Sequence, residues 1–199
     1  MSKVILGIDA SNIREGGGVT HLVELLRNAE PQNQGITKVI VWSGSKTLET
    51  IENRPWLKKI NSPKLDKGLL NRMLWQLLEL PKAVKASDCD VLFVPGGSYA
   101  GLFRPFVTMS QNLLPFEWRE ILRFGWSLDT LKLLILRWSQ SRTFKRAGGV
   151  IYLADYAKRT VLKVTGALPG KTVVIPHGIN SNFFLPPRRQ RLVEEFKKS

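Results

Sequence analysis

The sequence is poor in cysteine and histidine. Among 199 residues it has one cysteine, Cys89, and two histidines, His21 and His177. A single cysteine excludes an intrachain disulfide and favours a reducing compartment such as the cytoplasm. The histidines are far apart in sequence and lack cysteine or carboxylate neighbours at metal-ligand spacing, so no metal site is expected. Because no histidine is near Cys89 in sequence, we interpret this cysteine as a packing residue rather than a nucleophile.

Long hydrophobic runs are also missing. The most apolar stretch, 131–138, is short and contains two cations, whereas a membrane span needs about 18 apolar residues. The chain start leads directly into a short apolar run that cannot serve as the core of a signal peptide. We therefore expect a cytoplasmic protein.

Acidic residues are scarce relative to basic ones. There are 30 Lys and Arg residues against 16 Asp and Glu residues, a net charge of +14, with most of the excess in the second half. Such a charge favours an acidic partner, namely nucleic acid, anionic lipid or a phosphate-bearing substrate. Nucleic acid is the least favoured of these, because no helix-turn-helix, zinc-finger or RNP motif is present.

Short apolar segments alternate with helical patterns along the chain. Strands are predicted at 4–8, 37–42, 90–94, 105–110, 150–153 and 171–175, and helices at about 19–28, 47–53, 65–86, 118–124, 128–145 and 155–165. Residues 56–60 are ambiguous, and Pro81 breaks or kinks the third helical pattern. This alternation predicts an α/β fold with a Rossmann-like parallel sheet and helices on both faces. We expect one domain over 1–185 and a charged C-terminal helix or tail over 186–199.

A glycine-rich loop, 7–20, joins the first strand to the first helix. Gly16, Gly17 and Gly18 lack side chains, so their backbone N–H groups can approach a ligand closely. The helix start adds a positive dipole end, which suits an anion or a polar sugar, and Thr20 adds a hydroxyl. The pattern is neither G-x-G-x-x-G nor a P-loop. A connection without any ligand is the alternative.

Two polar residues lie in this loop or next to it, Asp9 within it and His21 directly after it. We interpret Asp9 as holding the loop through hydrogen bonds to its backbone rather than as a catalytic carboxylate. His21 either faces the cleft or lies on the helix surface, and the sequence leaves both open. Farther along, Glu117 and Trp118 either border an acceptor or simply pack.

Two more loops follow predicted strands, at 95–98 and 110–112. Because the carboxyl ends of parallel strands share one edge, these loops can converge with the glycine loop in one cleft. They contain Gly96 and Gly97, and the amides of Gln111 and Asn112. An amide can hydrogen-bond a sugar hydroxyl.

Six segments together resemble the N-terminal half of family 4 glycosyltransferases, nucleotide-sugar enzymes with the two-domain GT-B fold. In order over about residues 3–185, they are 7–10, 16–22, 93–97, 110–116, 151–157 and 174–180. The resemblance implies retaining transfer from a nucleotide-sugar to a saccharide or lipid-linked acceptor held by this domain. It implies no metal or other cofactor, and a role in polysaccharide biosynthesis.

The resemblance also assigns roles to individual residues. Gly16, Gly17 and Gly18 take the place of the loop that approaches the donor phosphates and the acceptor, with Thr20, Gly96 and Gly97 as further substrate-binding residues. Gln111 and Asn112 stand at the catalytic position where the family often has His-Asp. An amide cannot act as a general base. The retaining mechanism proposed for the family passes the acceptor proton to the leaving phosphate, so a base is not required.

The family's second domain supplies most donor contacts, including two glutamates spaced as Glu-x7-Glu. The last segment of this chain has no such pair, since Glu194 and Glu195 are adjacent. We therefore expect that the chain needs the missing donor domain, or a second polypeptide, to transfer sugar.

Residues 117–146 interleave cations with tryptophan and leucine. Such helices can lie in the headgroup plane of an anionic membrane, here its inner face. The alternative is an ordinary helix pair that buries its apolar stripe on the sheet. A second function class is also open: a non-enzymatic Rossmann-like module that binds an anionic ligand or a membrane surface.

Overall fold

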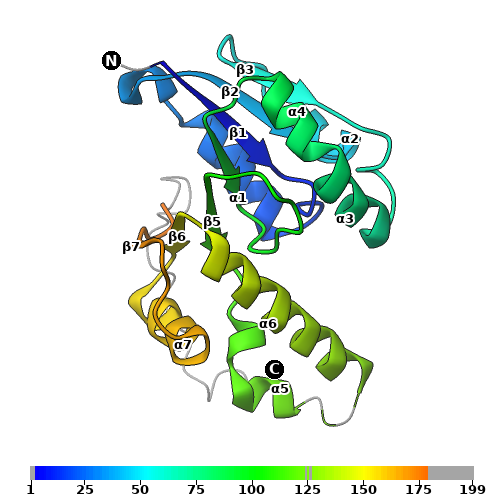
Figure 1. Ribbon diagram of the computed structural model, residues 1–199, viewed down its shortest axis with the longest axis vertical. Coiled ribbons are helices and arrows are strands. Elements are labelled where there is room, and N and C mark those ends of the chain that lie inside the picture. Colours follow the sequence, from blue (N-terminus) through cyan, green and yellow to red (C-terminus); the bar gives the residue numbers. More distant parts are fainter. Residues whose placement is uncertain (1–2, 124, 126, 179–199) are drawn as a thin grey trace, which may run out of the picture.

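The computed structural model describes residues 3–123, 125 and 127–178. Seven parallel strands form one sheet in the order β3-β2-β1-β4-β5-β6-β7 (Figure 1). They are β1 Val4–Asp9, β2 Ile36–Trp42, β3 Leu57–Ile60, β4 Val91–Val94, β5 Phe106–Ser110, β6 Gly149–Tyr152 and β7 Lys171–Val174. The chain runs outward from β1 through β2 to β3, and then resumes on the other side of β1 with β4. The strand order therefore reverses between β1 and β4, and parallel α/β sheets bind ligands at such a switch point.

Helices cover the two faces of the sheet. They are α1 Gly17–Arg27, α2 Ser45–Thr50, α3 Leu69–Leu78, α4 Leu80–Ala86, α5 Trp118–Arg123, α6 Leu128–Arg146 and α7 Asp155–Thr165, with 3-10 turns η1 Pro31–Gln34 and η2 Leu114–Phe116. In Figure 1, α5, α6 and α7 lie below β5, while α3 and α4 lie beside the first three strands. The predicted Rossmann-like parallel sheet with helices on both faces is confirmed.

The apolar core has two parts, one on each face of the sheet. One part contains Trp42, Trp75, Phe106 and Phe144, so it joins the sheet to α3 and α6. The other contains Ile8, Leu22, Leu26, Val41 and Leu48, so it joins the sheet to α1 and α2.

Cys89 belongs to the core on the α3 face, which confirms its interpretation as a packing residue. Burial, followed by the charge of Asp90, raises the pKa of its thiol to about 11. The thiol is therefore protonated and unreactive at neutral pH.

The structure differs from the predicted helices and strands in two segments. The ambiguous segment 56–60 contains strand β3, which pairs with β2. The pattern over 65–86 is two helices, and the break falls at Glu79, two residues before Pro81. Proline is favourable in the first turn of a helix, where its missing N–H needs no acceptor, and Pro81 occupies that place in α4. The predicted tail, 186–199, lies outside the described residues.

Candidate functional site

The loops after β1, β4 and β5 meet at the carboxyl edge of the sheet. A Cβ placed on Gly18 would lie 3.5 Å from Oε1 of Gln111, and one placed on Gly96 would lie 3.5 Å from Cβ of Asn12. The expected convergence of the glycine loop with the other two loops is therefore present. It falls at the switch point between β1 and β4.

The N-terminus of α1 is open toward this edge. Gly16 has φ +68°, and no side chain caps the helix. The first N–H groups of a helix have no acceptor within the helix, so those of Gly17 and Gly18 are available to a ligand. A Cβ on Gly16 or Gly17 would meet nothing within 4 Å, and Thr20 is exposed in the first turn. This end of α1 can therefore hold an anion or a hydroxyl oxygen.

The side chains of Gln111 and Asn112 make different contacts. Gln111 is half-buried, its Nε2 donates to Sδ of Met109 at 3.5 Å, and its Oε1 faces Gly18. Asn112 is exposed, and its Oδ1 accepts from the Leu114 N–H at 3.0 Å, which starts η2. Only Gln111 is therefore directed at the glycine loop.

Gly97 forms the turn after β4 from a buried position. It has φ +72°, and a Cβ there would lie 3.1 Å from the carbonyl oxygen of Met109 and 3.2 Å from Nε2 of Gln140. This glycine permits close contact between the loop, β5 and α6.

A buried polar network supports the loop after β1. Asp9 is 2% exposed, and it accepts hydrogen bonds from the Ser11 N–H at 3.1 Å and from Gln76 Nε2 at 2.6 Å. Gln76 also donates to Ser11 Oγ at 3.0 Å, and its Oε1 accepts from the Ala100 N–H at 3.2 Å. Burial raises the pKa of Asp9, and the hydrogen bonds from Ser11 and Gln76 oppose the rise. The expectation that Asp9 holds the loop is confirmed.

Two arginines border the same loop. Arg72 of α3 donates through Nη1 to the Ser11 carbonyl at 3.3 Å, and Arg14 donates through Nη1 to the Lys67 carbonyl at 2.9 Å. Burial and the nearby charge of Arg14 lower the pKa of Arg72. These cations and the positive end of the α1 dipole add positive charge at this edge.

A cavity of about 830 Å³ lies next to this edge, on the α1 face of the sheet. Its wall is mainly apolar, from β1, β4, β5 and β6, and polar groups from His21, Glu24 and His177 line it. The rings of His21 and His177 meet edge-on with centroids 4.6 Å apart. Met109 lines the cavity and also contacts Gln111, so the cavity and the loop cluster are neighbours. His21 lines this cavity beside the loop cluster rather than the cluster itself.

The histidine pair predicts acid sensitivity. Burial, and secondly His177, lower the pKa of His21 below its ordinary 6.5. The folded chain therefore keeps His21 neutral while the unfolded chain takes up a proton, and stability is full above about pH 6.5 and falls as the pH drops. Urea midpoints measured from pH 7 to pH 5 should fall less steeply in His21→Gln than in the wild type.

The control for that measurement is Glu24→Gln, which removes the carboxylate that lines the cavity and leaves both histidines in place. It should keep the wild-type slope between pH 7 and pH 5. An unchanged slope in His21→Gln would contradict the assignment.

The switch point of this parallel sheet lies beside an uncapped helix N-terminus, glycine turns and two arginines. The domain is of the Rossmann-like α/β class and has the form of one half of a GT-B fold. The sequence model described as Glycosyltransferase Family 4 matches residues 15–183. The chain belongs to glycosyltransferase family 4, with the N-terminal type of domain. No curated protein matches it in sequence.

The outer helices do not bury their apolar stripe as a simple helix pair would. Trp118 is 53% exposed beneath the Arg137 guanidinium, 5.0 Å from the ring centre. Glu117 accepts a hydrogen bond from the Tyr156 hydroxyl. Among the described residues, no helix is both long and apolar enough to cross a bilayer.

Proposed function

We propose that this chain binds a sugar acceptor at the switch point between β1 and β4 and forms the acceptor half of a retaining, nucleotide-sugar-dependent glycosyltransferase. The acceptor is a saccharide or a lipid-linked saccharide. Membership of the family supports glycosyl transfer in general. The meeting of Gly18 with Gln111 beside the open N-terminus of α1 is the observation that carries the proposal.

The chemistry of the edge suits this role. Gln111 orients an acceptor hydroxyl through its amide, which can donate and accept but cannot take up a proton. In the proposed reaction the acceptor proton passes to the leaving phosphate of the donor, so no base is needed on this chain. The N–H groups of Gly17 and Gly18, with Arg14 and Arg72 nearby, balance the negative charge of phosphate groups.

Donor contacts come, in this proposal, from a second domain or polypeptide of the GT-B type. The reaction takes place on the cytoplasmic side of the membrane and requires no metal. Turnover of UDP- or GDP-sugar by the purified 199-residue chain alone would contradict the proposal that a second domain or polypeptide supplies the donor contacts.

Acceptor binding can be measured directly on this chain. Saturation-transfer NMR against a panel of saccharides and lipid-linked saccharides should identify a ligand, and Gln111→Ala should weaken its binding about 2- to 10-fold, the effect of one lost hydrogen bond. Gly18→Val should weaken it further, because the side chain would occupy the space in front of Gln111.

The matched control is Gln32→Ala. Gln32 is an exposed glutamine in η1, before β2 and therefore at the opposite edge of the sheet. It should bind the saccharide as the wild type does. Equal losses in Gln32→Ala and Gln111→Ala would place the acceptor elsewhere. A chain that binds phosphate or nucleotide but no saccharide in the panel would support the non-enzymatic alternative.

A further inference from the structure

Most apolar residues of α3 face solvent rather than the core. Six of them are between 37% and 75% exposed: Leu69, Leu70, Met73, Leu74, Leu77 and Leu78. The buried side of the helix is instead formed by Trp75 and Gln76. A contiguous exposed patch of this kind marks an interaction surface.

Helix α6 also exposes most of its large apolar side chains to solvent. Only Gln140, Thr143 and Phe144, all in its C-terminal third, are buried. Its earlier turns and α5 expose large apolar side chains to more than half of their area: Trp118, Leu122, Leu128, Leu131, Ile135 and Trp138. Two helices distant in sequence therefore carry unpartnered apolar faces.

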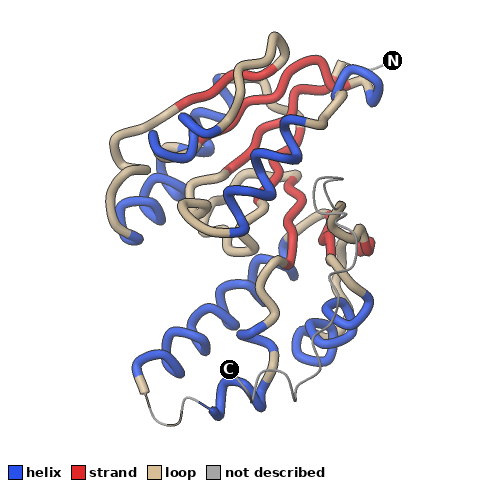
Figure 2. Tube along the Cα trace, turned by 180° about the vertical axis from the view of Figure 1, so that it is seen from behind, coloured by secondary structure: helices blue, strands red, loops and turns tan. Residues whose placement is uncertain are grey.

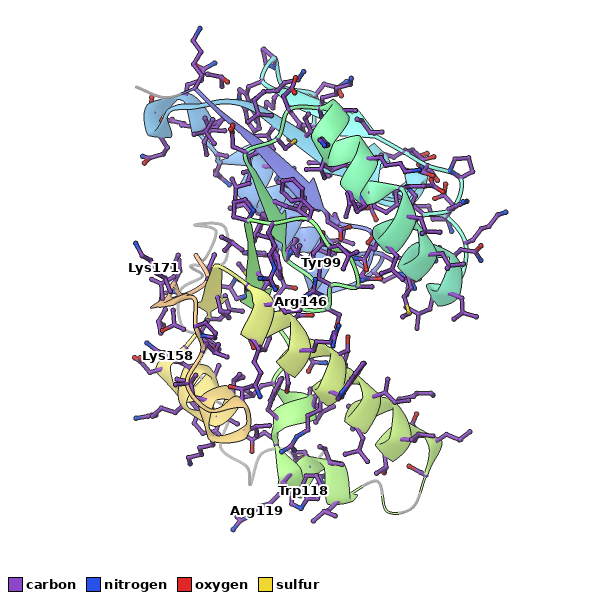
Figure 3. All side chains as sticks on the ribbon, in the orientation of Figure 1. Tyr99, Trp118, Arg119, Arg146, Lys158 and Lys171 are labelled. Carbon is purple, nitrogen blue, oxygen red and sulfur yellow. The ribbon has the colours of Figure 1, made fainter. Side chains whose placement is uncertain are left out.

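Cations surround the apolar residues of α5 and α6. From 117 to 146 there are seven Lys or Arg residues, namely Arg119, Arg123, Lys132, Arg137, Arg142, Lys145 and Arg146, against three acidic residues. Arg137 stacks on Trp118, and Arg142 lies 6.0 Å from the ring centre of Trp138. In Figure 3, Arg119 extends outward beside Trp118 at the far end of the molecule from β1. Basic residues interleaved with tryptophan and leucine complement anionic lipid headgroups.

Both helices reach the candidate site through their buried sides. On α3, Gln76 binds Asp9 and Arg72 binds the loop after β1. On α6, the Thr143 hydroxyl accepts from the Tyr99 N–H at 2.9 Å, next to the glycine turn after β4. The first turns of α3 and α6 extend toward the same side of the molecule in both views (Figures 1 and 2). The loop cluster is therefore in contact with both helices.

We propose that α3 and the α5–α6 pair together form a docking surface for an anionic membrane, with the acceptor edge between the two contacts. Leucine and tryptophan side chains enter the headgroup region, and the surrounding cations pair with lipid phosphates. Docking would let a lipid-linked saccharide reach the switch point from the bilayer. This consequence for the choice of acceptor rests on the proposed function. The docking itself requires no transfer reaction.

The test is flotation of the full chain with vesicles of phosphatidylcholine alone and of phosphatidylcholine with phosphatidylglycerol. We expect binding to the anionic vesicles that weakens between 50 mM and 500 mM salt. Leu70→Glu and Ile135→Glu, one on each contact, should each reduce binding about tenfold, and the pair should abolish it. Both residues are more than half exposed, so the variants should keep the wild-type unfolding midpoint.

Val173→Glu is the matched control. Val173 is an exposed apolar residue of β7, the strand at the edge of the sheet, and this variant should bind as the wild type does. If vesicle binding fell in Ile135→Glu but not in Leu70→Glu, α3 would not be part of the docking surface. Absence of binding to anionic vesicles would overturn the proposal, as would a stable dimer, detected by light scattering, that both glutamate variants dissociate. Saccharide binding is measured without vesicles, so failure of docking and failure of the proposed function are distinguishable.

Discussion

Replacing Gly97 by alanine is expected to lower the free energy of unfolding by about 2 kcal/mol or more. The residue has φ +72°, a left-handed conformation that costs a residue with a Cβ roughly 1–2 kcal/mol. The added methyl group would also lie 3.1 Å from the Met109 carbonyl oxygen, which belongs to β5 and has little freedom to move. Overpacking of this kind typically adds about 1–3 kcal/mol. Urea unfolding followed by circular dichroism measures the change.

Gly96→Ala is the matched control, one residue earlier in the same turn. Its φ lies outside the left-handed region, and its Cβ would meet only Cβ of Asn12 at an ordinary 3.5 Å. This variant should stay within about 0.5 kcal/mol of the wild type, as expected where no special feature is touched. If the two variants lost equal stability, the turn would not depend on the conformation of Gly97.

The fold and part of the candidate site followed from local patterns in the sequence. Short apolar runs separated by helical patterns require a parallel sheet, and parallel strands place all their carboxyl ends at one edge. This is why Gly18 and Gln111, distant in sequence, could be expected in one cleft. The roles of these residues in binding and catalysis stay predictions.

Other contacts could not be predicted from the sequence, because they depend on which side of a helix packs against the sheet. In α3 the leucine spacing indicates a helix, yet the side that packs on the sheet carries Trp75 and Gln76. A polar residue can face the core because Gln76 finds partners in Asp9, Ser11 and Ala100. The pairing of His21 with His177 is equally long-range, since it requires α1 and the segment after β7 to meet on one face of the sheet. Hydrophobic periodicity alone predicts neither the buried side of α3 nor the contact between the two histidines.

Gln76→Leu is expected to cost about 1.5–3 kcal/mol at pH 7. Gln76 donates its shortest hydrogen bond to the buried carboxylate of Asp9, and bonds to charged groups contribute about this much. Leucine fills a similar volume, so the loss reflects the missing hydrogen bonds, above all the one to Asp9, rather than a cavity. Gln140→Leu is the matched control. It is a buried glutamine of α6 whose Oε1 has no partner in the described part of the chain, and it should change stability by less than about 1 kcal/mol.

The pH dependence separates a lost charge interaction from general damage to the core. The pKa of Asp9 is already raised by burial, and the hydrogen bond from Gln76 is among the contacts that lower it. Without Gln76 the folded-state pKa rises further, so the folded state is penalised while Asp9 is ionised, and relieved as the pH falls through that pKa. The deficit of Gln76→Leu should therefore shrink as the pH is lowered through the raised pKa of Asp9. Adding Asp9→Asn removes the charge, so the double variant should lose less than the sum of the two single variants. A deficit that stays constant with pH, or strict additivity, would show that Gln76 acts through its hydrogen bonds to Ser11 and Ala100 rather than through the charge of Asp9.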